Sequence, residues 1–209
     1  MGIAVGRWDS RLWKETLAHH GRIARVCAEF AIAQDDEATF PYDGDLFGAF
    51  ETSFVLAAFC IRRLSEKRLL TDALNEKKWG VGMYPSSEAI RQPYVGHSSN
   101  GFYRGYKFDK RGTHTLTLKE LGHEIIHSSN LGIVTEEDEL PIGIVVASDN
   151  RLSKRVLHIS LDQWTEVCFA VLDDRVYSES DQWNPETGEI TATREGAAEA
   201  KERVRKTGK

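Results

Sequence analysis

Apolar residues recur at steps of three and four in the first third of the chain, and this spacing predicts two helices. The first is expected to begin at Asp9 or Ser10, either of which can cap a helix, and to end near Gln34. The second is expected to run from about Leu46 to Leu74. One side of it carries a continuous apolar stripe, which consists of Phe47, Phe50, Phe54, Ala57, Ile61 and Leu64.

The segment between these helices contains Pro41 and Gly44, so we expect a connection there and an antiparallel helical hairpin. Residues 79–112 show no long period and are rich in Gly, Ser, Pro and Tyr, which predicts an irregular stretch. Aromatic residues at 102–108 could form a short strand within or beside it.

Thr117 and Glu120 form a T-x-x-E capping box, which predicts a short helix ending near Asn130. The pattern then changes to compact apolar runs at 131–134, 141–148 and 155–160, which predict three strands. Because their connections are short, we expect an antiparallel meander.

Ser160 and Gln163 form a second capping box and predict another helix after the strands. We expect this helix to cover one side of the sheet with its apolar face, which consists of Leu161, Trp164, Val167, Cys168, Val171 and Leu172.

The predicted fold class is α+β, with an N-terminal helical hairpin and a small antiparallel sheet of three or more strands covered by a helix. We expect one domain over residues 1–178, with a helical part at 9–75 and a mixed part at 79–178. Residues 179–209 read as a polar tail, with a hairpin around the turn at 184–188 and a short helix near the end.

The composition is that of a globular protein: 209 residues, 41% hydrophobic, 28% charged and a net charge of −5. This charge argues against a surface coated for nucleic acid, although it leaves room for a local basic patch. There is no apolar run of membrane-spanning length and no apolar signal segment at the N-terminus. Three cysteines, Cys27, Cys60 and Cys168, lie among apolar residues without a CxxC pair. We therefore expect a soluble cytoplasmic protein with no membrane partner, in which the cysteines are structural.

The segment His123-Glu-Ile-Ile-His127 has the form H-E-x-x-H and resembles the zinc-binding motif of the zincin metallopeptidases. The resemblance implies that His123 and His127 bind zinc from one face of a helix and that Glu124 polarises a metal-bound water. A third ligand would be needed, and Glu166 is the best-placed acidic residue. The alternative is an amphipathic helix whose polar side, with Glu120, Glu124 and both histidines, faces solvent or a second element of the fold. No cofactor is expected unless this motif holds zinc.

In residues 102–119, cationic side chains are interspersed with aromatic rings, and Asp109 is the single acidic residue. Cations that neutralise phosphates beside rings that stack on bases are typical of RNA or single-strand binding. The candidate nucleic-acid residues are Arg104, Lys107, Lys110, Arg111, Tyr103 and Tyr106. The alternative is an aromatic edge strand whose lysines prevent pairing with other chains.

The spacing of Arg91 and His97 resembles the R-x4–6-H motif of the HEPN ribonucleases, although Pro93 and Gly96 interrupt it. This resemblance implies that the same region could cleave RNA. The leading expectation is different: an interaction or accessory module that works through contacts with a protein partner or with its own copies. The zinc-dependent hydrolase and the RNA-directed protein are the two alternatives.

Overall fold

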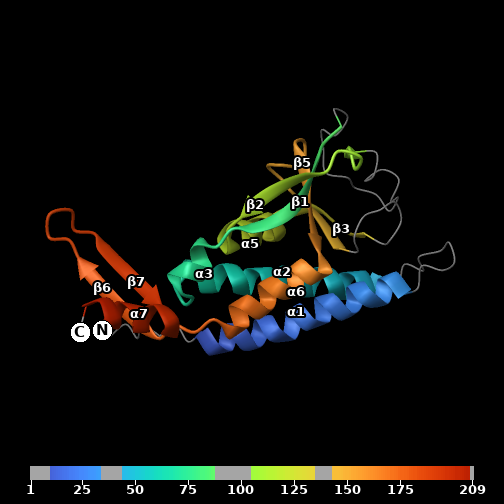
Figure 1. Ribbon diagram of the computed structural model, residues 1–209. Helices are drawn as coiled ribbons and strands as arrows, with labels where there is room; N and C mark the ends of the chain where they lie inside the picture. The colour runs from blue at the N-terminus through green and yellow to red at the C-terminus, as the bar shows by residue number, and fades with distance from the viewer. Residues whose placement is uncertain (1–9, 34–43, 88–104, 135–142, 208–209) are drawn as a thin grey trace, which may run out of the picture.

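The computed structural model describes residues 10–33, 44–87, 105–134 and 143–207. Helices α1 (Ser10–Ala33) and α2 (Gly44–Glu66) lie side by side along the base of the molecule (Figure 1). They form the predicted helical hairpin, and the described part of α1 starts at Ser10, while the other candidate cap, Asp9, lies outside the described ranges. In the described ranges, no helix is both long enough and apolar enough to cross a lipid bilayer.

Helix α2 ends at Glu66, which is earlier than the predicted end at Leu74. Arg68 takes a left-handed conformation with φ of 53°, and the amide of Leu69 donates to the carbonyl of Leu64 at 2.9 Å, so the helix closes there. Thr71 then caps the short helix α3 (Asp72–Glu76) by accepting a hydrogen bond from the amide of Leu74. The predicted end at Leu74 was therefore wrong, because the apolar spacing does not show where the backbone of α2 turns.

The main sheet has five antiparallel strands in the order β2-β1-β5-β4-β3. The predicted meander is present as β3 (Ser128–Val134), β4 (Gly143–Ser148) and β5 (Arg155–Ser160). Strand β3 starts at Ser128, so the preceding helix is shorter than predicted. The expected α+β class with an antiparallel sheet is confirmed.

One strand, β1 (Trp79–Pro85), lies inside the stretch 79–112 that the sequence predicted to be irregular, and another, β2 (Gly112–Leu116), starts at the last residue of that stretch. Close packing explains one of the two glycines in β1, because a Cβ atom on Gly82 would lie 3.2 Å from the Cβ of His158 on β5. Within the segment 102–108, Tyr106 forms an isolated bridge with Ser86, while residues 102–104 lie outside the described ranges.

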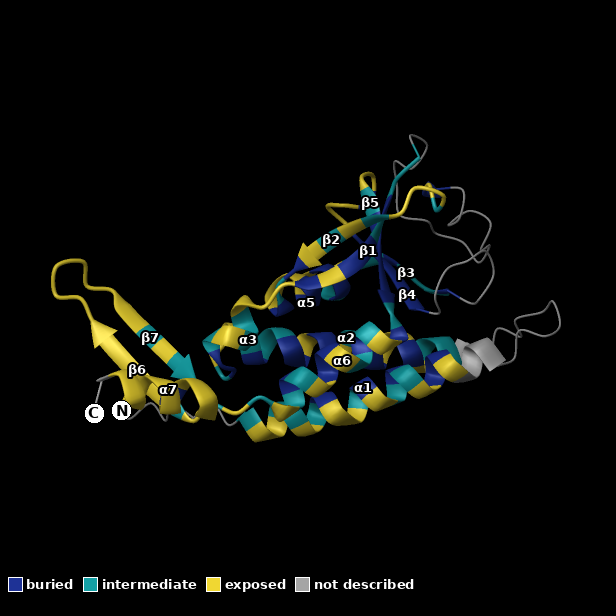
Figure 2. Ribbon diagram, viewed as in Figure 1, coloured by how far each residue is buried: buried dark blue, intermediate teal, exposed yellow. Residues whose placement is uncertain are grey.

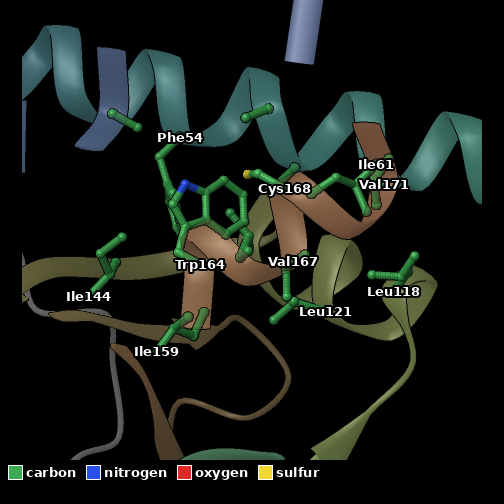
Figure 3. Packing of buried hydrophobic residues seen from close by; sticks show 14 of the residues in the cluster. Phe54, Ile61, Leu118, Leu121, Ile144, Ile159, Trp164, Val167, Cys168 and Val171 are labelled. Atoms are coloured by element: carbon green, nitrogen blue, oxygen red, sulfur yellow. The ribbon is translucent and has the colours of Figure 1, made fainter. Parts of the chain in front are cut away.

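Helices α5 (Leu118–Ile126) and α6 (Leu161–Asp173) pack on one face of the sheet, and α1 and α2 pack against them in the same core. Both predicted capping boxes are present at their starts. The indole of Trp164 packs on the ring of Phe54 with centroids 4.6 Å apart, in the centre of the core (Figure 3). Phe54 is fully buried, as the stripe on α2 predicted.

The opposite face of the sheet carries a second apolar cluster: Tyr84, Tyr106, Val134, Val145, Ala147, Leu152 and Val156. Strand β4 shows why its sequence is apolar without alternation. Ile144 and Val146 belong to the helix-covered core, whereas Val145 and Ala147 belong to the second cluster. Both faces of this strand are therefore buried.

The chain ends in a separate two-stranded hairpin, formed by β6 (Ser178–Trp183) and β7 (Ile190–Glu195), and in helix α7 (Ala197–Thr207). We call residues 178–195 the C-terminal arm. The arm extends from the end of the helical layer, away from the main sheet (Figure 1). At its base the amide of Arg194 donates to the carboxylate of Asp72 at 2.8 Å, and Ala200 of α7 is buried.

Candidate functional site

The HEIIH segment lies on α5 and at its C-terminal end. His123 and His127 are both exposed, with ring centroids 4.5 Å apart. Nε2 of His127 lies 3.4 Å from Nη1 of Arg62 on α2, and the backbone amide of His127 donates to the carbonyl of His123. The two imidazoles are therefore neighbours on the surface, as their i,i+4 spacing predicted.

Glu124 lies on a different side of this helix, which corrects the prediction that it shares the polar face with the histidines. It is buried, and its carboxylate accepts hydrogen bonds from Oγ of Ser148 at 2.6 Å and from Nη2 of Arg155 at 2.9 Å. The helix is covered by α2 on one side and by β4 on another, so a position that looked polar on the wheel points at the sheet. Arg155 supplies the counter-charge that allows a carboxylate there.

Glu166, the predicted third metal ligand, lies on α6 and is exposed. Its carboxylate is 3.5 Å from Nζ of Lys77. It lines a hollow of about 170 Å³ with Trp79, Leu121 and Gln163, which is smaller than most small-molecule sites. Among the described residues, no three His, Cys, Asp or Glu side chains come together as a metal site.

His114 on β2 lies in the electrostatic field of the Glu124–Arg155 pair and was not singled out by the sequence. Burial lowers the pKa of His114, and the positive charges of Arg155 and Arg151 lower it further against the opposing effect of Glu124. His114 lies near Arg155 and Glu124 because of the register of β2 against β1, which pairs His114 with Val81. No local pattern in the sequence could have shown this.

The candidate nucleic-acid residues fall into three groups. Tyr103 and Arg104, together with Arg91 and His97, lie outside the described ranges. Tyr106 is buried, and its hydroxyl donates to the carbonyl of Leu152 at 3.1 Å, so this ring packs in the protein and offers no stacking face to a base. Burial raises the pKa of its phenol to about 12.

The remaining cations of the segment, Lys107, Lys110 and Arg111, are exposed, and the fold brings two further cations to them. Ser86 at the end of β1 donates its amide to the carbonyl of Lys154, in the turn between β4 and β5. On the other side of β1, the amide of Lys107 donates to the carbonyl of Pro85. We call the exposed set at this end of the sheet the basic end; it consists of Lys107, Lys110, Arg111, Arg151 and Lys154.

The three cysteines are buried and unpaired by disulfides, which fits the structural role predicted for them. Burial raises the pKa of the Cys60 thiol to about 11 and that of Cys168 to about 12. Since the thiolate is the reactive form, neither has the lowered pKa of a catalytic cysteine.

The C-terminal arm is the most exposed part of the described chain. Residues 179–191 are all exposed, and the hairpin appears in yellow almost throughout (Figure 2). Trp183 and Ile190 stand opposite each other across the two strands and are 66% and 63% exposed. Tyr177, next to the start of β6, is 73% exposed. Sequence reasoning treated this region as a polar tail and missed these apolar side chains as a group.

The arm has a defined internal structure. The side chain of Asn184 accepts hydrogen bonds from the amides of Glu186 and Thr187, and Gly188 takes a φ of 70° that suits a glycine. Across the strands, Arg194 forms ion pairs with Glu179 and Asp181. The turn thus orders the tip of the hairpin, and the ion pairs join the two strands nearer to its base.

Comparison of the chain with protein-family models, with curated proteins and with solved structures gave no match.

Proposed function

We propose that the protein acts as an interaction module that contacts a partner protein through its C-terminal arm. The observation that carries this proposal is the exposure of Trp183, two-thirds of which is open to solvent beside an equally open Ile190. Tryptophan is enriched among the residues that dominate protein–protein binding energies, because it buries a large apolar area with little loss of conformational entropy.

The alternative explanation is that the Trp183–Ile190 pair only stabilises the hairpin. A cross-strand pair of this kind contributes about 0.2–1 kcal/mol. That contribution does not require a tryptophan, and it leaves most of the apolar area of both side chains in water. A two-stranded hairpin without a covering layer is itself only marginally stable, so an arm that projects in this way gains most from a partner that packs on it.

The charge on the arm indicates which properties a partner surface needs in order to bind the arm. Glu186 and Glu189 flank the apolar pair and form no ion pair with a described residue. Two arms of the same chain meeting tip to tip would bring these carboxylates together, which costs energy. A partner with an apolar pocket and a cationic rim complements the arm better than a second arm does.

Quantitative affinity capture from cell extract would test the proposal, with the wild-type protein and the double variant Trp183→Ser/Ile190→Ser. Phe169→Ser provides a matched control, because Phe169 is an exposed aromatic residue on α6, away from the arm. We expect the wild type and the control to retain the same protein, and the arm variant to lose it. Sedimentation velocity over a range of concentrations would show whether that partner is a second copy.

Identical capture profiles for the wild type and the arm variant would contradict the proposal. Thermal melting of each variant, followed by circular dichroism, separates loss of contact from loss of folding. Because the substituted residues are exposed, we expect the melting temperatures to stay close to that of the wild type.

A further inference from the structure

The basic end is independent of the C-terminal arm and concentrates positive charge on a protein whose net charge is −5. Five exposed cations lie there, and the described acidic residues of the same segments are Asp109 and Asp149. None of the five forms an ion pair with a described residue, whereas Arg155, next to them in the chain, is paired with Glu124.

Backbone pairing fixes the spacing of these cations. Ser86 is flanked by the chain at Lys154 on one side and by the chain at Tyr106, with which it forms a bridge, on the other. Neighbouring strands lie about 4.8 Å apart, so the backbones that carry Lys154 and Lys107 are about 10 Å apart. Cations on both sides of a gap of this width can contact more than one phosphate of the same strand.

The two loops that carry the cations are held together by hydrogen bonds. The hydroxyl of Tyr106 donates to the carbonyl of Leu152, and Oγ of Ser86 donates to the carbonyl of Ser153. Leu152 is buried and anchors the turn that presents Arg151 and Lys154. The cations are therefore presented from a fixed backbone, so binding has less conformational entropy to overcome.

We propose that the basic end binds the phosphate backbone of single-stranded nucleic acid. The cations come from two separate loops, and the ring of Tyr106 is buried between them. Contact is therefore made to phosphates without base stacking by that ring, and RNA and single-stranded DNA bind alike. An anionic membrane is a poorer fit, because among the described residues at this end of the sheet there is no exposed large apolar side chain.

The test is fluorescence anisotropy with labelled oligo-uridine and oligo-thymidine between about 50 and 200 mM salt. Wild-type protein should bind both, and log K should fall with log salt with a slope of up to about −3.5, since each phosphate contact to a single strand contributes about −0.7. The variants Arg151→Ala/Lys154→Ala and Lys107→Ala/Lys110→Ala should each lower the affinity and reduce the slope by about 1.4.

A matched control removes the same charge elsewhere. Lys201 and Arg205 are exposed on α7, and Lys201→Ala/Arg205→Ala changes the net charge by the same two units. This variant should bind as the wild type does. Absence of binding at the lowest salt would overturn the proposal, as would equal losses in the control and the basic-end variants. Binding to vesicles of anionic phospholipid without binding to either oligonucleotide would overturn it in favour of a membrane surface.

Discussion

Trp183 on β6 and Ile190 on β7 are cross-strand partners at the tip of the C-terminal arm, and about two-thirds of each side chain is exposed. Trp164 is the opposite case, because it is almost completely buried against Phe54. Trp164 therefore stabilises the fold, whereas Trp183 is available for contact with a partner.

Trp183→Ala should leave the fold nearly unchanged, because the side chain buries little area in the free protein. We expect the free energy of unfolding to fall by less than about 1 kcal/mol, most of it the lost cross-strand contact with Ile190. Urea denaturation followed by circular dichroism measures this change. A loss of several kcal/mol would show that Trp183 is part of the core and not a binding residue.

Phe54→Ala should be strongly destabilising, since the ring of this α2 residue is fully buried, stacks on Phe50 and packs at a tilt against Trp164 of α6. The expected loss of stability is about 3–5 kcal/mol, from lost burial and from the cavity left behind. Phe169→Ala, at an exposed position of α6, should cost less than about 0.5 kcal/mol in the same denaturation experiment. Similar losses for the two variants would contradict this packing.

Features that are set by residues close together in the sequence could be predicted. These features include the apolar stripe of α2, which buries Phe54, and the two capping boxes. Strands β1 and β2 could not, because Gly80 and Gly82 interrupt the alternation and β2 lies at the sheet edge with polar residues exposed. Strand β1 depends on pairing with β5, which is distant in the chain, and β2 in turn pairs with β1.

The same distinction between local and long-range features applies to the candidate sites. The i,i+4 spacing correctly placed His123 beside His127, but the helix wheel could not show that Glu124 faces Arg155. Similarly, Lys107 belonged to a visible basic run, whereas Lys154 joins it only because Ser86 pairs with both loops.

The buried pair of Glu124 and Arg155 should be costly to break from one side. Arg155→Met leaves the carboxylate of Glu124 buried with only the hydrogen bond from Ser148, and we expect a loss of about 3–5 kcal/mol. The double variant Glu124→Leu/Arg155→Met removes both charges and should be more stable than Arg155→Met alone. If the double variant is the less stable of the two in urea denaturation, the pair is not coupled as described.

Stability should fall in mild acid, partly because of His114. Its pKa is lowered in the folded protein by burial and by Arg155 and Arg151, so the unfolded chain binds the proton more readily. The contribution is fully present above the ordinary histidine pKa of about 6.5 and is lost as the pH falls through the lower folded-state pKa. His20, whose pKa is lowered by burial and by His19, adds an effect of the same sign.

His114→Gln should therefore flatten, without abolishing, the fall in melting temperature between about pH 7 and pH 5. The double variant His20→Gln/His114→Gln should flatten it further. Thermal melts across this pH range measure both slopes, and a slope in His114→Gln equal to that of the wild type would refute the assigned environment of His114.

Site-specific photo-cross-linking tests the role of the C-terminal arm most directly. Benzoylphenylalanine is placed at Ile190, which leaves Trp183 intact, or at Phe169 as the exposed control on α6. On irradiation in cell extract, position 190 should cross-link to a discrete protein, position 169 should not, and Trp183→Ser in the same chain should abolish the product. No cross-link from position 190 above the level at position 169, or a cross-link that survives Trp183→Ser unchanged, would contradict the account.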